Sequence, residues 1–269
     1  MYKLIALDLD GTLLRNDKTV SENNIEMIKK AREKGVKVVL CTGRPIDGVK
    51  WLIDLLDLKN EDDYTVCYNG AIVKNNTSGD IIFDQPLRMN DFKELYKLSK
   101  ELKVNIHALT NEAVVTPKNS KYTKLEAELN GITIKEIPID KLAENTDIIK
   151  VMYVDEPEYL KEIIKKVKDK GLGEKYTLVQ SAPFFFEFLK YGINKWTAVK
   201  VLGEELGIKE EEIICVGDAG NDYHMIKNAG LGVAMENGFK EVKEIADYIT
   251  STNEEDGVGK VIQKFILNK

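Results

Sequence analysis

The chain has 269 residues, of which 43% are hydrophobic, and carries a formal net charge of -6 at pH 7. This length predicts one large or two ordinary domains around a sizeable apolar core, and the acidic balance argues against a general nucleic-acid-binding surface. No membrane-span, signal or lipidation pattern is visible, so we expect a cytoplasmic protein whose partners are neither membranes nor nucleic acids.

Strands and helices alternate at both ends of the chain. Buried or half-buried strands are predicted over 3–8, 36–41, 65–68, 71–74, 80–84, 212–216 and 232–234. Helices are predicted over 22–34, 45–57 and 194–206, from 222 onward, and near the C-terminus. The sequence from 76 to 79, Asn-Thr-Ser-Gly, predicts a hairpin between two of these strands. Such alternation indicates an α/β fold with a doubly wound parallel sheet.

The middle of the chain has a different pattern. Between 84 and 189, helices are predicted over 91–102 and 156–170 among several short strands. The aromatic run over 184–188 is interpreted as a core or interface strand. We therefore predict a core domain made of 1–83 and 190–269, with 84–189 inserted as a second, α+β domain.

Two carboxylates follow the first apolar strand. Asp8 and Asp10 are separated by one residue and precede Gly11, whose turn can direct both carboxylates into one cleft at the strand's C-terminal end. Charges at the end of a buried strand are costly unless they are neutralised, and a divalent metal ion is the simplest way to do so. The alternative for a lone Asp-Gly pair is an ordinary capped turn.

A hydroxyl, a glycine and an arginine end the second predicted strand. Thr42, Gly43 and Arg44 come just before a helix N-terminus, where a hydroxyl and free backbone N–H groups make a natural phosphate cradle. The equally weighted alternative is that Thr42 only caps the helix.

Acids also follow a strand near the C-terminus. The sequence from Gly217 to Asp222 contains Asp218 and Asn221, and strand-end acids of one sheet can converge on one ion. Mg²⁺ fits such a site because it binds few carboxylates and keeps several waters. Lys195 begins a helix directly after the insert, a position where a surface lysine is the usual interpretation.

Cysteine and histidine offer little catalytic material. The three cysteines, Cys41, Cys67 and Cys215, are too scattered for a metal knuckle or a disulfide framework and are expected to be buried thiols. The chain has only two histidines, and His107, between two apolar residues, is interpreted as structural. Catalysis by a Ser–His or Cys–His pair is therefore disfavoured.

Taken together, these motifs resemble the haloacid dehalogenase superfamily. The four motifs of that superfamily occur in order: Asp8-Leu-Asp10-Gly-Thr, then Thr42, then Lys195, then Gly217-Asp218-Ala-Gly-Asn221-Asp222. The large insert, the Tyr68-Asn69-Gly70-Ala71 segment and the 233–238 segment are similar to the Cof-type branch of its phosphatases, whose substrates are often sugar phosphates. The insert corresponds to the cap of that branch.

The resemblance implies a role for each matching residue. Asp8 is expected to be the nucleophile that forms an aspartyl-phosphate, and Asp10 the general acid and base. Mg²⁺ is expected between Asp8, the Asp10 backbone carbonyl and Asp218. Asp222 is expected to orient a metal-bound water or the lysine of the third motif. The remaining residues are expected to hold the phosphoryl group or substrate: Thr42, Gly43, Arg44, Asn69, Lys195 and Asn221.

The sequence therefore predicts a Mg²⁺-dependent phosphatase that acts on a small phosphorylated metabolite. A phosphomutase on the same scaffold is the enzymatic alternative. A receiver-like phosphoacceptor also combines clustered Asp, Thr and Lys, but it needs only about one ordinary domain and leaves the insert and the fourth motif unused. The identity of the substrate and the oligomeric state do not follow from the sequence.

Overall fold

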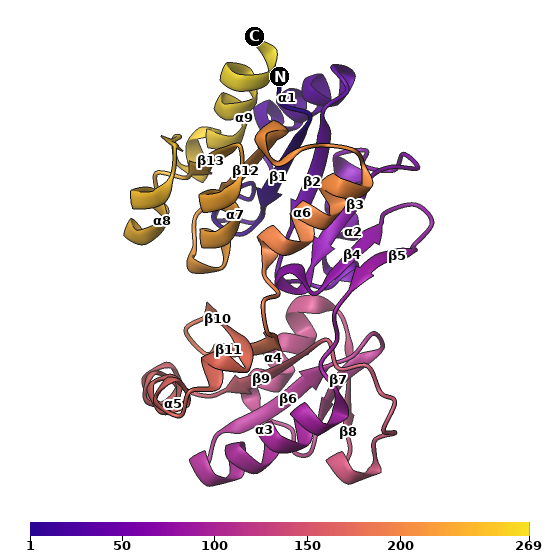
Figure 1. The fold of residues 1–269 in the computed structure, drawn as a ribbon, viewed down its shortest axis with the longest axis vertical. Coiled ribbons are helices and arrows are strands. Elements are labelled where there is room, and N and C mark those ends of the chain that lie inside the picture. The colour runs from indigo at the N-terminus through magenta and orange to yellow at the C-terminus, as the bar shows by residue number, and fades with distance from the viewer. Residues whose placement is uncertain (269) are drawn as a thin grey trace. The chain divides into compact units, whose positions relative to one another are not determined.

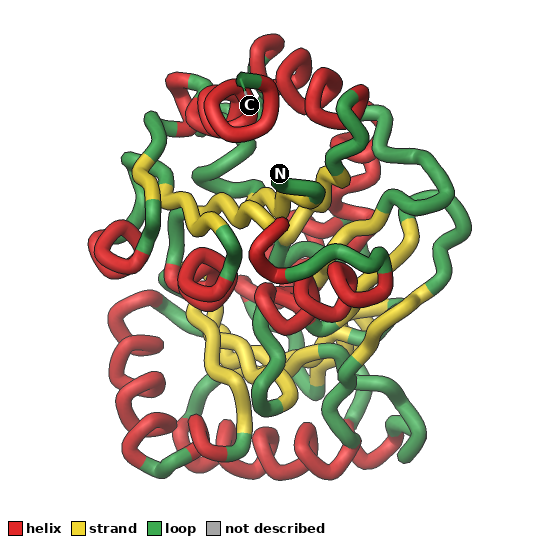
Figure 2. Tube along the Cα trace, turned by 45° about the horizontal axis from the view of Figure 1, so that its top comes forward, coloured by secondary structure: helices red, strands yellow, loops and turns green. Residues whose placement is uncertain are grey.

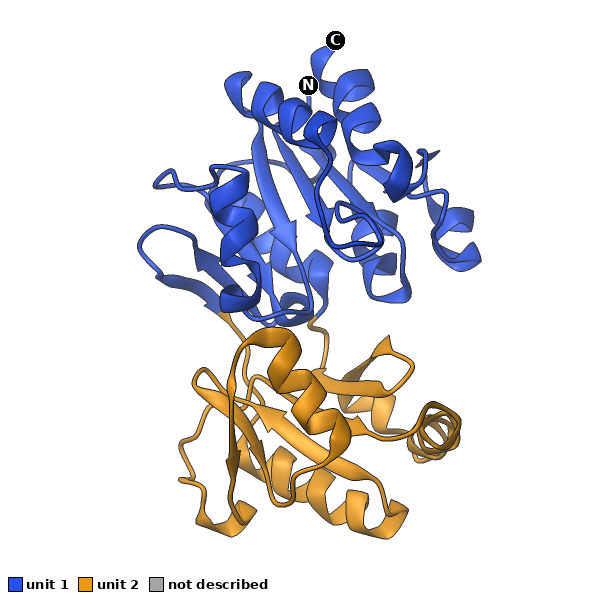
Figure 3. Cartoon of the chain, turned by 180° about the vertical axis from the view of Figure 1, so that it is seen from behind, with its two compact units in different colours: residues 1–83, 194–269 blue, residues 84–193 orange. Residues whose placement is uncertain are grey.

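A computed structural model describes residues 1–268 of the chain. They form two compact units, shown in blue and orange in Figure 3. Unit 1 comprises Met1–Phe83 together with the chain from Asn194 onward, and unit 2 is Asp84–Ile193. Unit 2 continues past 189 because its last strand runs to Lys190. No helix among the described residues combines the length and the apolar character that crossing a membrane requires.

Unit 1 is built on an eight-stranded sheet with the order β14-β13-β12-β1-β2-β3-β4-β5. The strands from β14 to β3 are parallel, which confirms the predicted doubly wound sheet, and β4 pairs antiparallel with β3 at one edge. The strand bounds are β1 (Leu4–Asp8), β2 (Lys37–Cys41), β3 (Tyr64–Cys67), β4 (Ile72–Asn75), β5 (Ile81–Asp84), β12 (Ile213–Gly217), β13 (Leu231–Ala234) and β14 (Tyr248–Ile249).

Helices cover both faces of this sheet, as Figure 2 shows. Their bounds are α1 (Glu22–Glu33), α2 (Lys50–Leu55), α6 (Lys195–Glu205), α7 (Tyr223–Asn228), α8 (Lys240–Ile245) and α9 (Gly257–Ile262). The short α8 and the two-residue β14 were not predicted, because neither segment is long enough to show a clear period.

The side chains of β1 point alternately to the two faces of the sheet, which explains why helices cover both faces. Ile5 and Leu7 belong to the apolar cluster formed with α1, α2 and α9, whereas Leu4 and Ala6 belong to the cluster formed with α6 and α7. Because successive side chains of a strand point to opposite faces, a strand that is apolar throughout must be covered on both. The strand is therefore central, and Asp8 at its carboxyl end lies between the carboxyl ends of β12 and β2.

Unit 2 has its own six-stranded sheet with the order β10-β11-β9-β6-β7-β8. All neighbouring strands are antiparallel except β7 and β8. Its elements, labelled in Figure 1, are α3 (Met89–Leu102), β6 (Asn105–Leu109), β7 (Ala113–Thr116), α4 (Lys121–Asn130), β8 (Thr133–Glu136), β9 (Lys150–Val154), α5 (Pro157–Asp169), β10 (Tyr176–Ala182) and β11 (Phe185–Lys190).

One apolar cluster stabilises unit 2. Phe186 and Phe188 of β11 are buried in it together with residues of α3 and α5, so the prediction of a core strand in the aromatic run is confirmed. His107 of β6 is fully buried, with its ring nitrogens 3.2 Å from Thr123 Oγ1 and 3.3 Å from Met152 Sδ. This agrees with the structural interpretation of that histidine.

Candidate active site at the carboxyl ends of the parallel strands

Polar residues stand at the carboxyl ends of three neighbouring strands of unit 1. β1 lies between β12 and β2, and its last residue, Asp8, is in register with Cys41. Thr42 follows β2 directly, and Asp218 follows β12 directly. The carboxyl ends of parallel strands are where α/β sheets place their ligands, because each chain leaves the sheet there into a loop.

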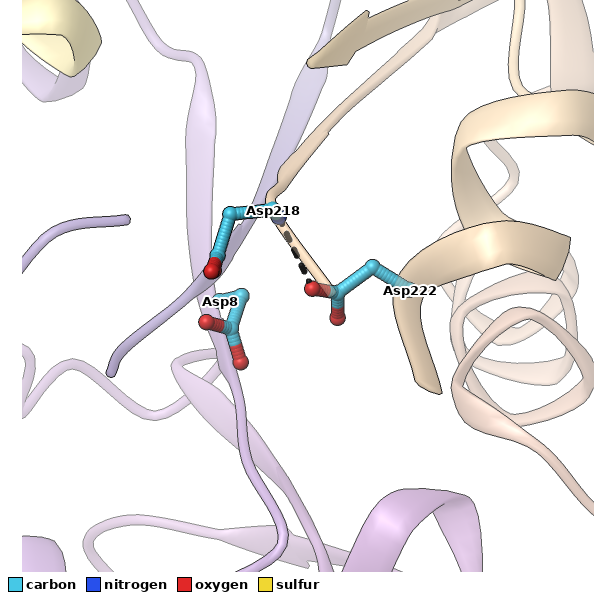
Figure 4. Close-up of side chains that lie close together, drawn as sticks. All are labelled: Asp8, Asp218 and Asp222. Atoms are coloured by element: carbon cyan, nitrogen blue, oxygen red, sulfur yellow. Dashed lines mark hydrogen bonds between the residues drawn. The ribbon is translucent and has the colours of Figure 1, made fainter. Parts of the chain in front are cut away.

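Three carboxylates meet at this edge. Asp8, Asp218 and Asp222 are buried, and each offers an oxygen within 4.8 Å of the others (Figure 4). Asp222 comes from the turn before α7 rather than from a strand. The side chains of Asp8 and Asp218, two of the predicted metal ligands, thus lie together. The third predicted ligand is the backbone carbonyl of Asp10, which is not a side chain and so does not belong to this group.

A fully buried lysine joins two of these carboxylates. Lys195 Nζ donates to Asp8 Oδ1 at 2.5 Å and to Asp222 Oδ1 at 2.6 Å, and the Lys195 side chain is 0% exposed. Burial on its own lowers the pKa of Lys195, but the charges of Asp222 and Asp8 outweigh it and raise that pKa above its ordinary range. Lys195 is thus held as an ammonium ion, and the interpretation as a surface lysine is excluded.

Asp222 uses both carboxylate oxygens inside the protein. One accepts from Lys195, and the other accepts from the backbone N–H groups of Asp218 and Ala219 at 3.0 Å each, the first of which is dashed in Figure 4. A carboxylate that accepts this many hydrogen bonds orients its neighbours and has little capacity left to bind a metal ion directly. This geometry supports the orienting role expected for Asp222.

The cluster carries more negative than positive charge. Burial and the charge of Asp222 raise the pKa of Asp8 well above its ordinary value, although Lys195 opposes this. Burial and the same neighbouring charge raise the pKa of Asp218 to about 6. Three carboxylates and one ammonium make a site in which a bound cation lowers the electrostatic energy.

The start of α6 positions Lys195. Asn194 caps the helix: its Oδ1 accepts from Thr197 N at 3.1 Å, and Thr197 Oγ1 accepts from Asn194 N at 3.0 Å. Gly70 packs against this cap so closely that an added Cβ would lie 2.1 Å from the Asn194 carbonyl oxygen. With φ at +100°, Gly70 also has a backbone conformation that other residues rarely adopt.

The Asp10 side chain contacts two cations. Arg44 donates to it twice, from Nε at 3.1 Å and from Nη2 at 2.7 Å, and Lys18 Nζ donates at 2.8 Å. Burial raises the pKa of Asp10, but the hydrogen bond from Lys18 and the charges of Arg44 and Lys18 outweigh it and lower that pKa. Asp10 was predicted as the general acid and base and Arg44 as a substrate contact. In this structure the two side chains form an ion pair with each other.

The predicted phosphate contacts lie beside one another. Thr42 is buried, and its Oγ1 accepts from the Arg44 backbone N–H at 3.1 Å, as in a capping turn. A Cβ on Gly43 would lie 3.2 Å from the Asn69 amide, so the backbone of Gly43 is close to that side chain. Asn221 Nδ2 donates to Asn69 Oδ1 at 3.0 Å, which links the loop after β3 to the loop after β12.

Sequence reasoning missed three residues that contact the site. Thr12 Oγ1 donates to Asp218 Oδ1 at 2.8 Å, and Asn237 Nδ2 donates to the Gly11 carbonyl at 2.8 Å. Lys18 contacts Asp10, as described above. Thr12 stands within the first motif and Asn237 within the 233–238 segment, so both could have been found there, but no local pattern marks Lys18.

Comparisons with known proteins agree with this geometry. Residues 5–262 match the model of the haloacid dehalogenase-like hydrolases. "Putative phosphatase YxeH" of Bacillus subtilis (strain 168) is 42% identical, with 100% of both chains covered. The 5-amino-6-(5-phospho-D-ribitylamino)uracil phosphatase YcsE of the same organism is 30% identical, with 98% of this chain and 96% of that protein covered.

A solved structure shows the same architecture. A haloacid dehalogenase-like hydrolase from Bacteroides thetaiotaomicron matches with a TM-score of 0.85 and 33% identity, covering 99% of this chain and 100% of that chain. A full-length sequence match and a full-length structural match thus accompany a strand-end carboxylate cluster of the expected composition. The chain belongs to the haloacid dehalogenase-like hydrolases, and within them to the Cof-type phosphatases, which hydrolyse phosphomonoesters.

Proposed function

We propose that this protein is a Mg²⁺-dependent phosphatase that hydrolyses small phosphomonoesters of the sugar-phosphate class through an aspartyl-phosphate on Asp8. One observation carries the proposal: Asp8 is a buried carboxylate at the end of the central strand, and Lys195 Nζ lies 2.5 Å from one of its oxygens. A nucleophile at this place has an ammonium beside it to bind the phosphoryl oxygens.

The residues at the strand ends fit a divalent metal ion. Oxygen donors from Asp8 and Asp218 lie close together, and burial, followed by the charge of Asp222, raises the pKa values of both carboxyl groups. Carboxylate oxygens are the ligands that Mg²⁺ prefers, and it leaves positions for water and phosphate. We propose that these two carboxylates and the Asp10 backbone carbonyl hold the ion, which supplies positive charge next to the transferring phosphoryl group.

Two steps then complete the reaction. In the first, an Asp8 oxygen attacks phosphorus, the bond from phosphorus to the ester oxygen breaks, and Asp10 gives a proton to the leaving alcohol. In the second, a water attacks the same phosphorus while Asp10 takes its proton, and the bond to Asp8 breaks to release phosphate. Asp10 must exchange its contacts with Arg44 and Lys18 for the leaving group, and its side chain is 43% exposed, so these ion pairs are inexpensive to exchange.

The phosphoryl oxygens need donors that are already in place. We propose Lys195, the Thr42 hydroxyl and the Gly43 N–H as these donors, with Asn221, Asn69 and Arg44 as further contacts to phosphate or substrate. Asp222 keeps Lys195 charged and directed at Asp8. Because phosphoryl transfer spreads negative charge over the equatorial oxygens, donors fixed before the reaction stabilise the transition state most.

The substrate class rests on the family and on its named relatives. The name of the relative YcsE describes a phosphate ester at the end of a ribityl chain. A sugar or polyol phosphate presents the same kind of primary phosphomonoester, and we extend that class to this chain. We also propose a cytoplasmic location, since Cys41, Cys67 and Cys215 are buried free thiols, the form expected in a reducing compartment.

A phosphate-release assay tests the proposal. Purified protein is incubated with an aryl phosphate and with a panel of sugar and polyol phosphates, each with Mg²⁺ and with excess chelator. We expect Mg²⁺-dependent release of inorganic phosphate and none from Asp8→Asn. Transfer of the phosphoryl group to a second sugar hydroxyl without free phosphate would identify a phosphomutase instead. A stable phosphoprotein without turnover would identify a phosphoacceptor.

A further inference from the structure

Two cations flank the carboxylate that is proposed to contact the leaving group. Lys18 lies in a loop after β1 and Arg44 in the loop after β2, and both donate to the Asp10 carboxylate. With one carboxylate and two cations, this rim of the site has a charge of about +1. The buried cluster of three carboxylates and one lysine has the opposite sign before a metal ion is bound.

Both cations have hydrogen-bonding capacity to spare. An ammonium has three N–H donors and a guanidinium has five. Asp10 uses one donor of Lys18 and two of Arg44. The side chains are 60% and 24% exposed, so their remaining donors reach solvent beside Asp10. These spare donors can therefore begin to bind an anion that approaches Asp10 before the contacts with Asp10 are exchanged.

The loop that carries Lys18 is anchored rather than loose. The Lys18 backbone N–H donates to the Arg15 carbonyl at 2.9 Å, and Lys18 has a left-handed φ of +66°. The Asn16 N–H donates to Glu254 Oε1 at 2.7 Å, and Asn253 Nδ2 donates to the Leu14 carbonyl at 2.9 Å. These contacts hold the backbone of Lys18 in place, within reach of Asp10, which its side chain contacts.

The contrast with Lys195 shows which lysine can exchange partners. Lys195 is fully buried between two carboxylates, and such a pair is costly to break. The Lys18–Asp10 pair is largely exposed, and exposed pairs contribute little free energy, so an incoming anion replaces one at low cost. Lys18 is thus suited to bind a substrate group that arrives and leaves in each turnover.

We propose that Lys18, together with Arg44, is a specificity-determining residue that selects phosphomonoesters whose leaving group carries a second anionic group, a carboxylate or a further phosphate. The inference rests on the proposed function, since Asp10 marks the leaving-group side only if it is the general acid. It narrows the substrate class from sugar phosphates in general to acidic ones.

Three aryl phosphates with a common ring test this inference: phenyl phosphate, 3-carboxyphenyl phosphate and 1,3-phenylene bisphosphate. The measured quantity is kcat/KM of each anionic substrate divided by that of phenyl phosphate, compared between wild type and Lys18→Gln. Intrinsic reactivity of the esters cancels in this comparison. We expect the ratio to fall about tenfold in Lys18→Gln, the size of one charge-assisted hydrogen bond. The two anionic substrates show whether carboxylate or phosphate is preferred.

Three further variants complete the experiment. Lys18→Arg keeps the charge and should keep the ratio, whereas Lys18→Glu should lower it further. Lys30→Gln removes another exposed, ion-paired lysine of unit 1, that of the Lys30–Glu26 pair, and should leave kcat/KM for all three substrates unchanged. An equal loss on all three substrates in Lys18→Gln, or no loss on any, overturns the inference while wild-type turnover of phenyl phosphate still supports the proposed function. Absence of that turnover contradicts the proposed function itself.

Discussion

Lys195 and Asp222 form an ion pair in which both side chains are 0% exposed and the two atoms are 2.6 Å apart. Such a pair contributes little net stability compared with apolar residues, because both ions lose their hydration. Its use is to fix an ammonium next to Asp8, whose oxygen it also contacts. The pair therefore connects the fourth motif to Asp8, the proposed nucleophile, through a single side chain.

Replacing Asp222 with Asn should damage both stability and activity. In wild type, one Asp222 oxygen accepts from Lys195 and the other accepts from the N–H groups of Asp218 and Ala219. An asparagine has only one side-chain oxygen, so its NH₂ group must face one of these donors. We expect a loss of about 3 kcal/mol in the free energy of unfolding, measured by urea titration, and a large fall in kcat. Asp54→Asn, which breaks the exposed pair with Lys59, should change stability by less than about 1 kcal/mol.

Gly70→Ala should disturb the active site without touching a catalytic group. The added Cβ would lie 2.1 Å from the Asn194 carbonyl oxygen, so the cap that places Lys195 must shift. We expect a destabilisation of about 2–4 kcal/mol together with a lower kcat. Gly35→Ala is the matched control, because Gly35 also has a positive φ, +82°, but nothing lies within 4 Å of its added Cβ. It should lose about 1 kcal/mol and keep its kcat. Equal kcat in the two variants would show that the close approach at Gly70 does not position Lys195.

Metal removal should abolish turnover. Excess chelator should stop phosphate release, and Mg²⁺ should restore it, because the carboxylates of Asp8 and Asp218 otherwise repel the incoming phosphate. Ca²⁺ should occupy the site and inhibit, since its looser coordination misplaces the reacting atoms. Asp218→Ala should weaken Mg²⁺ binding, measured by calorimetry, and lower turnover with it. Full activity in excess chelator contradicts the metal-dependent mechanism.

The stability of the protein should depend on pH through His107. Burial and then the charge of Lys150 lower the pKa of His107 from 6.5 to about 3. Between these two values the unfolded chain binds a proton that the folded chain does not, so this histidine makes stability rise as the pH rises from about 3 to 6.5. At pH 5 its contribution is about 2 kcal/mol less than at pH 7.

Denaturant titrations at pH 5 and pH 7 measure this dependence. Between pH 7 and pH 5, His107→Gln should lose about 2 kcal/mol less free energy of unfolding than the wild type. His224→Gln, which replaces an exposed histidine, should behave like wild type. The same pH dependence in all three proteins would show that His107 does not titrate as argued.

Separate substitutions should distinguish the roles of the two carboxylates in the first motif. Asp8→Asn should form no phosphoenzyme and show no turnover with any substrate. Asp10→Asn should still release nitrophenol from nitrophenyl phosphate, because that leaving group needs no proton, but the second step should be slow. Rapid-quench kinetics should therefore show a burst close to one equivalent of enzyme and phosphate trapped on the protein.

Two results would refute these assignments. An alkyl phosphate should give almost no burst with Asp10→Asn, because its alkoxide needs the missing acid, so an equal burst with both substrates argues against Asp10 as the acid. Labelled phosphate found on a residue other than Asp8 argues against the nucleophile. Asp17→Asn, in an exposed turn beside the site, is the control and should turn over like wild type.

Much of the fold follows from local patterns. The apolar runs over 3–8, 36–41 and 212–216 appear as buried strands because a strand covered on both faces must be apolar throughout. Helix α6 begins at Lys195 because Asn194 and Thr197 cap it, which is a local signal. The polar residues that end these strands were predictable as site residues for the same reason, since parallel strands end at one edge.

Tertiary structure alone decided how these residues contact one another. The resemblance implied that Asp222 orients a metal-bound water or Lys195. The contact of Lys195 with both Asp8 and Asp222 is set by packing, because the three residues come from separate segments. Likewise, Lys18 and Arg44 meet at Asp10 only because the loops after β1 and β2 leave neighbouring strands. The sequence by itself determined which chemical groups stand at the strand ends, and long-range packing decided which of them form hydrogen bonds and ion pairs with one another.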